Sequence, residues 1–119
     1  MSQDNQGLND VCPLSEAALL LNSKWDLVVI HNLMDQPLRF SELKDKISKG
    51  LDTPITSSSL TRILRKLESE NLLCRDISAE VGESVEINYE LTSSGYALKA
   101  AIEELKKWGA QYLLHKEIS

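Results

Sequence analysis

The chain has 119 residues, of which 42% are hydrophobic and 26% charged, so it can bury one core but is too short for two ordinary domains. Its longest apolar run, AALLL at 17–21, is far too short for a membrane-spanning helix. The formal net charge of -5 argues on its own against a nucleic-acid partner, so the distribution of charge has to decide that question.

The amino-terminal segment MSQDNQGLND is polar and acidic, unlike a signal or transit peptide. We expect residues 1–10 to form a flexible lead and residues 11–116 to form a single domain. Two cysteines without a secretion signal favour a reducing compartment, so we expect free thiols and a cytoplasmic location.

Three amphipathic segments before residue 51 are expected to be helices. In residues 12–22, Pro13 suits the first helical position and a broad apolar face follows it. Residues 24–36 indicate a buried central helix that Pro37 ends, after which PLRF makes a brief extended link. Residues 41–48 start at Ser41, a suitable N-cap, and Gly50 lies just beyond their end.

The segment TSSSLTRILRKLESE at 56–70 predicts a fourth helix, with Thr56 as its cap and Asn71 as a left-handed stop. Its buried stripe consists of Leu60, Ile63, Leu64 and Leu67. A helical wheel centred on this stripe turns a small polar and basic set outward, with Lys66 at its flank: Ser58, Thr61, Arg62, Arg65 and Ser69.

After residue 71 the apolar pattern changes from helical to alternating. Residues 72–78 and 84–92 therefore predict two strands of a β-hairpin that turns around Gly82. Thr92 can cap a last helix with a long apolar stripe, formed by Leu98, Ile102, Leu105, Trp108 and Tyr112. Such a stripe can pack on its own domain or on a second subunit, and because the core is small we expect it to form a homodimer interface.

These elements predict a mainly α fold with a small β-hairpin, arranged as a winged helix-turn-helix that dimerises through its terminal helices. The chain resembles the HxlR-type transcriptional regulators, winged-helix proteins related to the MarR superfamily. The matching segments are CP at 12–13, KW at 24–25, LRFSEL at 38–43, SLTRILRKLESENLL at 59–73, YELTSSG at 89–95 and KKWGAQYL at 106–113. The resemblance implies a cytoplasmic DNA-binding homodimer whose helix at 56–70 reads the major groove.

The chain departs from that family pattern in its turns and in its wing. Asn22 and Ser23 stand where the family usually has glycines, and Asn71 stands at another such position. The wing segment SAEVGESVE at 78–86 has three glutamates and no cation, where the family commonly has a proline-rich stretch ending in a basic residue. This wing tip repels phosphate, which argues against its contact with DNA.

The cations are concentrated in the predicted helix-turn-helix. Between Pro37 and Lys66, seven cations and three anions give a net charge of +4, whereas the rest of the chain carries -9. Hydroxyl groups can bond base edges or phosphates, arginine can contact guanine, and the N-terminus of a helix favours phosphate. The candidate DNA-binding residues are Arg39, Lys44, Thr56, Ser57, Ser58, Thr61, Arg62, Arg65 and Lys66. The alternative is a capped helix with solvated cations, and for Arg39 and Lys44 an i,i+4 ion pair or plain solubility.

The two cysteines are expected to differ. Cys12 precedes Pro13 at a helix N-terminus, where the helix dipole lowers a thiol pKa, although Asp10 opposes this effect. Members of the resembled family use a cysteine at this position as a redox or electrophile switch, so the resemblance makes Cys12 a candidate sensor, with an ordinary thiol as the alternative. Cys74 is expected in the core, on the first strand of the hairpin.

The sequence contains no P-loop, no G-x-S-x-G and no helical H-E-x-x-H, and neither His31 nor His115 has a partner at metal-ligand spacing. We therefore expect no enzyme, no metal and no cofactor. The predicted function is a transcriptional regulator that binds double-stranded DNA as a homodimer on a pseudo-palindromic operator. Its input would be modification of Cys12 or a small-molecule effector in the dimer crevice. The alternative is a winged-helix protein-interaction module that uses the acidic wing and the terminal helix.

Overall fold

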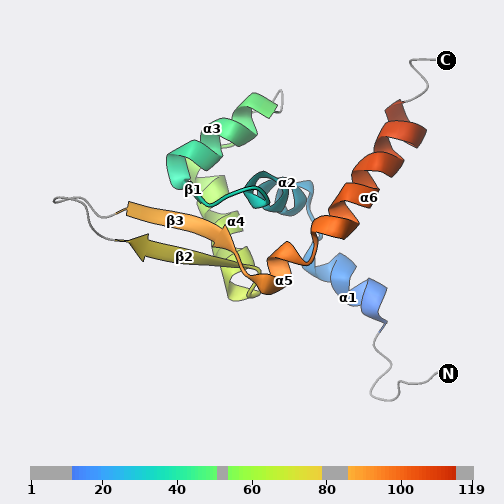
Figure 1. The fold of residues 1–119 in the computed structure, drawn as a ribbon, viewed down its shortest axis with the longest axis horizontal. Coiled ribbons are helices and arrows are strands. Elements are labelled where there is room, and N and C mark those ends of the chain that lie inside the picture. Colours follow the sequence, from blue (N-terminus) through green and yellow to red (C-terminus); the bar gives the residue numbers. More distant parts are fainter. Residues whose placement is uncertain (1–11, 51–53, 79–85, 115–119) are drawn as a thin grey trace.

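The computed structural model describes residues 12–50, 54–78 and 86–114. It is mainly helical with a small antiparallel sheet, which confirms the predicted fold class (Figure 1). Its elements, in chain order, are α1 (Pro13–Leu20), α2 (Lys24–Leu33), β1 (Leu38–Arg39), α3 (Phe40–Gly50), α4 (Ser57–Ser69), β2 (Leu73–Ser78), β3 (Glu86–Leu91), α5 (Ser93–Tyr96), α6 (Lys99–Gly109) and the π-helical turn η3 (Ala110–Leu114).

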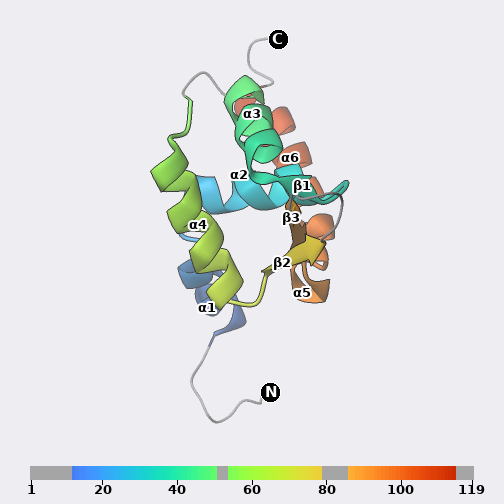
Figure 2. The ribbon, with the colours of Figure 1, turned by 90° about the vertical axis from the view of Figure 1, so that its left-hand side faces the viewer.

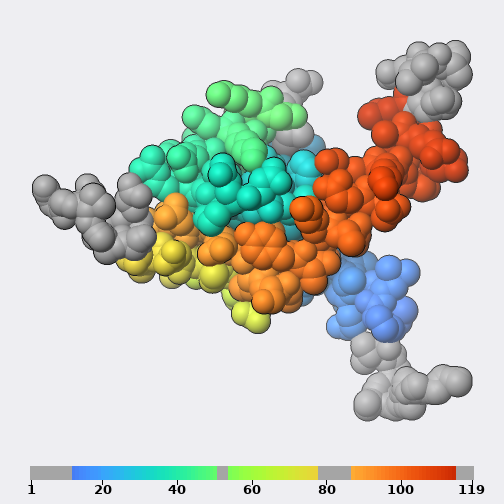
Figure 3. All heavy atoms as spheres, viewed as in Figure 1, coloured from blue at the N-terminus to red at the C-terminus, as the bar shows by residue number. Residues whose placement is uncertain are grey.

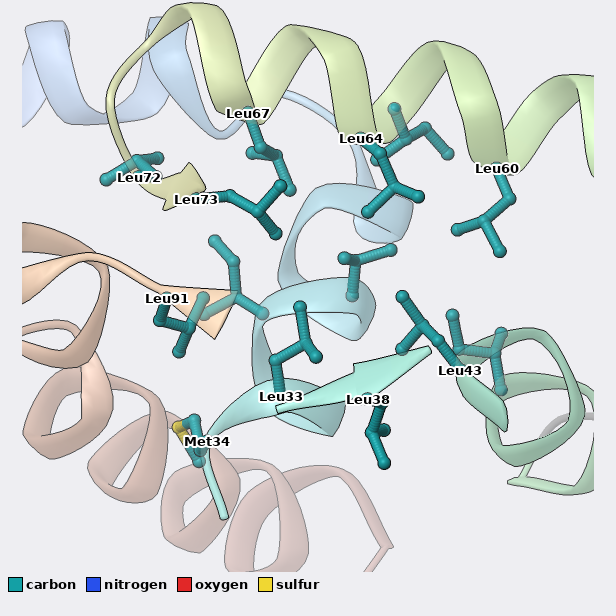
Figure 4. Packing of buried hydrophobic residues seen from close by; sticks show 14 of the residues in the cluster. Leu33, Met34, Leu38, Leu43, Leu60, Leu64, Leu67, Leu72, Leu73 and Leu91 are labelled. Atoms are coloured by element: carbon teal, nitrogen blue, oxygen red, sulfur yellow. The ribbon is translucent and has the colours of Figure 1, made fainter. Parts of the chain in front are cut away.

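One hydrophobic core connects most of these elements. Helix α2 crosses it, with Val29, Ile30 and Leu33 fully buried. Helix α4 packs its predicted stripe against this core, and Leu73 and Leu91 close it from the two long strands (Figure 4). Burying each such side chain contributes about 1.5–3 kcal/mol, so the apolar stripe fixes which side of α4 faces outward.

The sheet has three strands in the order β1-β3-β2, one more than the predicted hairpin. β2 and β3 pair antiparallel as expected, from Leu73 opposite Leu91 onward. The extra strand lies within PLRF, where Leu38 pairs with Tyr89 and Arg39 with Asn88. The predicted turn around Gly82 and the predicted lead lie outside the described residues.

Helix α3 begins at Phe40, directly after the short strand, so the predicted N-cap at Ser41 is wrong. The Glu42 carboxylate accepts a hydrogen bond from the Arg39 N–H at 2.9 Å, which satisfies a backbone donor at this helix end. Because β1 leads straight into α3, backbone pairing with β3 anchors the start of that helix to the sheet. Helix α2 also ends earlier than predicted, at Leu33 rather than next to Pro37.

Both predicted ends of α4 are confirmed. Thr56 has extended backbone angles, and its hydroxyl accepts a hydrogen bond from the Ser59 N–H at 3.1 Å. Asn71 has a φ of 63°, the left-handed conformation that ends a helix and turns the chain into β2. Helix α4 therefore has a fixed start and a fixed end.

The predicted long terminal helix is broken. Thr92 caps it as expected by accepting from the Gly95 N–H at 3.2 Å, but it caps the short helix α5. Gly95 is buried so close to the Leu72 carbonyl that an added Cβ would collide with that oxygen. The Leu98 N–H then bonds to the Gly95 carbonyl, three residues back, and α6 leaves in another direction (Figure 1).

Candidate nucleic-acid interface

Helix α4 runs along one side of the molecule, with α2 behind it (Figure 2). With its apolar stripe in the core, five polar side chains of α4 are exposed and Thr61 is half-buried; the exposed ones are Ser57, Ser58, Arg62, Arg65 and Ser69. One open hollow of about 630 Å³ is lined by Ser57, Ser58, Thr61, Arg62 and Arg65. The structure therefore brings together five of the nine predicted DNA-binding residues on the surface of a single helix. We call these five the α4 polar face.

Thr56 stands apart from this set because its hydroxyl caps the helix. It fixes the position of the first turn, where free backbone N–H groups and the positive end of the helix dipole favour an anion. The side chains of Ser57 and Ser58 project from this same turn and are exposed. This end of the α4 polar face is thus suited to a phosphate or to the acceptors on a base edge.

Lys66, which the sequence analysis also counted among the DNA-binding candidates, does not line the α4 polar face. Its ammonium turns toward α2 and lies 2.5 Å from the buried carboxylate of Asp26. It also donates to the Leu20 carbonyl at 2.9 Å and to Asn22 Oδ1 at 3.3 Å. The helical wheel placed Lys66 at the flank of the helix, and a lysine side chain is long enough to reach inward from there.

The two remaining predicted residues lie beside the helix-turn-helix rather than on α4. Arg39 is exposed at the end of β1, and its guanidinium lies 3.6 Å from the Glu42 carboxylate. This ion pair spans three residues, not the four of the i,i+4 pair that the sequence left open as an alternative. Lys44 is half-buried on α3. Both are cations of the supporting segment, and neither lines the hollow on α4.

Arg75 is a cation near α4 that the sequence analysis did not single out. It lies on β2, and its Nε donates to Glu68 Oε2 of α4 at 3.0 Å. Together with Arg65 it lines a small cavity of about 180 Å³ between α4 and the sheet. The strand pattern could have identified it. Leu73 points inward, and Arg75, two residues later, lies on the same face of β2, which is the face beside α4.

The predicted dimer residues divide into a buried and an exposed group. Ile102 is only 6% exposed and belongs to the core of its own chain, and Leu98 is half-buried against that core. Leu105, Trp108 and Tyr112 are more than half exposed, and the two rings lie 5.7 Å apart. Ile102 thus belongs mainly to the core of its own chain, whereas the side chains at the other end of the stripe are exposed.

Helix α1 adds to this open apolar surface. No residue of α1 is buried, and Leu14 and Leu19 are among the most exposed large apolar residues described. Both α1 and α6 project from the body (Figure 3). A groove of about 690 Å³ runs between them, and its lining includes Leu14, Leu21, Leu105 and Trp108. We call this the α1–α6 groove.

Cys12 is exposed at the N-cap position of α1. Its pKa is lowered from the ordinary value, first because the Ser15 N–H stabilises the thiolate, and further because the Ser15 hydroxyl and the Leu14 N–H do so, while Glu16 opposes the effect. Asp10, the predicted opposing charge, lies outside the described residues. Cys74 is also exposed, so its predicted place in the core is wrong: strand alternation buries Leu73 and turns the next side chain outward.

The described residues contain neither a cluster suited to a metal ion nor a membrane-spanning helix. Among the described residues, no three His, Cys, Asp or Glu side chains lie close enough together to hold a metal ion. His31 instead has its Nε2 3.2 Å from the Lys106 ammonium of α6. Within the same described ranges, no helix combines the length and the apolar character needed to cross a bilayer.

Comparisons of the sequence and of the structure with known proteins all match helix-turn-helix transcriptional regulators. A model of the HxlR-like helix-turn-helix family matches residues 20–117. Over 119 residues the chain is 37% identical to an HTH-type transcriptional regulator of Methanothermobacter thermautotrophicus, which covers 99% of this chain and 86% of the relative. The reduced form of the transcriptional regulator YodB from Bacillus subtilis superposes with a TM-score of 0.72 at 34% identity, over 87% of this chain and 95% of YodB. The quinone-bound form of YodB gives 0.67 at 31% identity, over 85% and 100% of the two chains.

Proposed function

The chain belongs to the HxlR-like helix-turn-helix family of DNA-binding transcriptional regulators, and we propose that two copies place their α4 helices in successive major grooves of a pseudo-palindromic operator. In this arrangement the grooves are about one helical turn of DNA apart. Family membership favours DNA binding over the predicted alternative, a protein-interaction module. The place of action that fits this role is the cytoplasm.

The α4 polar face is the observation that carries this proposal. Small hydroxyl side chains at the start of the helix let its backbone approach base edges closely, and two exposed arginines follow one turn later. Arg62 and Arg65 are assigned to bases, since arginine can donate two hydrogen bonds to guanine. Ser57, Ser58 and Thr61 are assigned to base edges or phosphates. Thr56 supports the interface by capping the helix.

The flanking cations are assigned to the DNA backbone. Arg39, Lys44 and Arg75 lie on the strands and on the helix next to α4, where they would meet phosphates on either side of a groove. Arg39 is paired with Glu42 and Arg75 with Glu68, so these two side chains have partners that position them. Contacts of this kind raise affinity for any sequence and carry little base preference.

We assign the homodimer interface to the α1–α6 groove and to the exposed end of α6. Support comes from the concentration of large exposed apolar side chains there, at Leu14, Leu105, Trp108 and Tyr112. A second copy of the chain would cover this surface through a two-fold axis, as most homodimers do. The leucines of η3, Leu113 and Leu114, are also more than half exposed and extend the same surface.

The proposed input is an oxidant or an electrophile that reacts with Cys12. The thiol is accessible and its pKa is lowered, which increases the fraction of reactive thiolate. YodB, which this chain resembles, has been solved in a quinone-bound form. Cys12 lies at the start of α1, two residues before Leu14 of the α1–α6 groove, so a modified side chain would disturb a surface assigned to the dimer. A small-molecule effector in the dimer crevice is the alternative input.

The test is fluorescence anisotropy with a labelled duplex from the DNA upstream of this gene, measured across salt concentration, with and without diamide. We expect the logarithm of affinity to fall linearly as the logarithm of salt concentration rises. A scrambled duplex should bind more weakly, and diamide should change the affinity of the wild type but not of Cys12→Ser. Equal affinity for both duplexes would contradict operator recognition, and an equal diamide response would remove Cys12 from the mechanism.

A further inference from the structure

Asp26 of α2 is the one charged residue that is buried among those the structure describes, with 1% of its surface exposed. A buried carboxylate is costly to keep ionised unless a cation and hydrogen-bond donors compensate it. Asp26 lies in the first turn of α2, where the helix dipole favours a negative charge. The dipole alone cannot replace the lost hydration, so the carboxylate needs a specific partner.

That partner is Lys66 of α4, and the partnership uses all of the lysine's donors. The ammonium lies 2.5 Å from Asp26 Oδ2, 2.9 Å from the Leu20 carbonyl and 3.3 Å from Asn22 Oδ1. A lysine ammonium has three N–H donors and no acceptor, so three acceptors satisfy it completely. Lys66 therefore has no donor left for a phosphate while this arrangement persists.

The three acceptors belong to three consecutive parts of the chain: the end of α1, the α1–α2 connection, and α2. Lys66 thus ties α4 to all of them at one point. Helix α1 has no buried residue, and this bond to its last carbonyl connects it directly to α4. This contact also gives Asn22 a structural role, because a glycine at this position would supply no side-chain oxygen to accept from Lys66.

We propose that the Asp26–Lys66 pair is a positioning pair: it sets how α4 sits on α2, and it transmits the position of α1 to the α4 polar face without touching DNA. The proposal rests on the assignment of that face to DNA. Arg62 is four residues before Lys66, one turn along the same helix. A shift of α4 at Lys66 therefore displaces the arginine that is assigned to a base.

The experiment compares variants in the full chain, using the same upstream duplex and the same salt series. Lys66→Met removes the tie, and Asp26→Asn weakens it while making the protein more positive by one charge. Lys107→Met is the matched control, since it removes a lysine from an ion pair with Glu104 on exposed α6. The double variant Asp26→Leu/Lys66→Met replaces the pair by apolar side chains that keep the contact between α2 and α4 packed.

We expect Lys66→Met and Asp26→Asn each to weaken binding about two- to thirty-fold with an unchanged salt slope, and Lys107→Met to bind like the wild type. The direction in which Asp26→Asn changes the affinity for DNA is decisive, because a pure charge effect would tighten binding. Tighter or equal binding by Asp26→Asn overturns the proposal. So does a salt slope that falls by about one in Lys66→Met, which would mark a lost phosphate contact. The double variant should bind as weakly as Lys66→Met. If it binds with wild-type affinity, the pair contributes only to stability and the proposal is overturned.

A second measurement keeps the two proposals distinguishable. Hydrogen exchange of the free protein should be faster in α1 and α4 of Lys66→Met than in the same helices of Lys107→Met. Unchanged exchange in α1 would overturn the coupling even if DNA binding weakens. If the wild type binds no duplex, or if Arg62→Ala binds like the wild type, the DNA assignment of α4 fails, and the exchange rates still decide whether the pair ties α1 to α4.

Discussion

Lys66 Nζ lies 2.5 Å from Asp26 Oδ2, and the two side chains are 32% and 2% exposed. Replacing Lys66 by methionine would leave the carboxylate buried without its cation. We expect the free energy of unfolding to fall by about 1–3 kcal/mol, the cost of an unsatisfied buried polar group. Urea unfolding at neutral pH measures this. Lys107→Met, whose ion pair is exposed on both sides, should change stability by less than about 0.5 kcal/mol, and an equal loss in both variants would contradict the prediction.

The two arginines of α4 should contribute directly to operator binding. Arg62→Ala or Arg65→Ala should weaken binding to the upstream duplex by about 1–3 kcal/mol and relax the preference for one base position. Neither side chain is part of the core, so both variants should remain folded. Competition with duplexes that vary one base pair at a time gives both quantities. Unchanged isotherms for both variants would remove α4 from recognition.

Trp108 should act in association rather than in folding of the single chain. It is 51% exposed and contacts Tyr112 on the same surface. Trp108→Ala should weaken the dimer by about 2 kcal/mol or more, as expected for a central interface aromatic. Sedimentation equilibrium gives the dissociation constant. Ile77→Ala, which removes an equally exposed apolar side chain from β2, is the control, and an equally tight Trp108→Ala dimer would contradict this interface.

Cys12 should react with iodoacetamide at a lower pH than a thiol in the unfolded chain, because its pKa is lowered chiefly by the Ser15 N–H. A lowered folded-state pKa means that these contacts stabilise the fold above the unfolded pKa, and that this contribution is lost as pH falls through the folded pKa. Ser15→Ala removes the hydroxyl that also stabilises the thiolate, so the pKa of Cys12 should rise toward the ordinary value. Mass spectrometry of labelled protein across pH follows this, with the Cys74 rate unaffected. An identical Cys12 profile in Ser15→Ala would exclude the hydroxyl as a cause.

Two glycines should respond to alanine in opposite directions. At Gly95 the added Cβ would meet the Leu72 carbonyl, so α5 must shift, and we expect a loss of about 1–3 kcal/mol. At Gly109 of α6 nothing lies within 4 Å of the added Cβ, so Gly109→Ala should gain about 0.5–1 kcal/mol through helix propensity. Thermal unfolding compares the two. A stable Gly95→Ala variant would show that the close approach does not constrain α5.

The parts of the fold that the sequence predicted correctly depend on local signals. The apolar stripe of α4, its cap at Thr56 and its stop at Asn71 each follow from residue type and from spacing within one helix. The α4 polar face could be predicted from the same helical wheel, because burying the apolar stripe fixes the rotation of the helix about its own axis. Alternation likewise predicted β3, and it would have placed Cys74 outside if it had been applied to β2 as well.

What the sequence missed depends on partners far away along the chain. β1 is two residues long and exists because β3 pairs with it, so no local periodicity reveals it. The inward turn of Lys66 depends on a carboxylate forty residues earlier. The break after Tyr96 depends on the Leu72 carbonyl, although Gly95 was visible in the sequence as the one residue that permits so close an approach.

The broken terminal helix separates two properties of the regulator. α5 is held against the start of β2, and the tight turn through Leu98 sets the direction in which α6 leaves. In a pair of copies joined through α6, that direction sets how far apart the two α4 helices lie, whereas side chains on α4 choose the bases. In the proposed dimer, the spacing of the operator half-sites and their base sequence would thus be determined by separate segments, and substitutions at residues 95–98 alone would change the spacing.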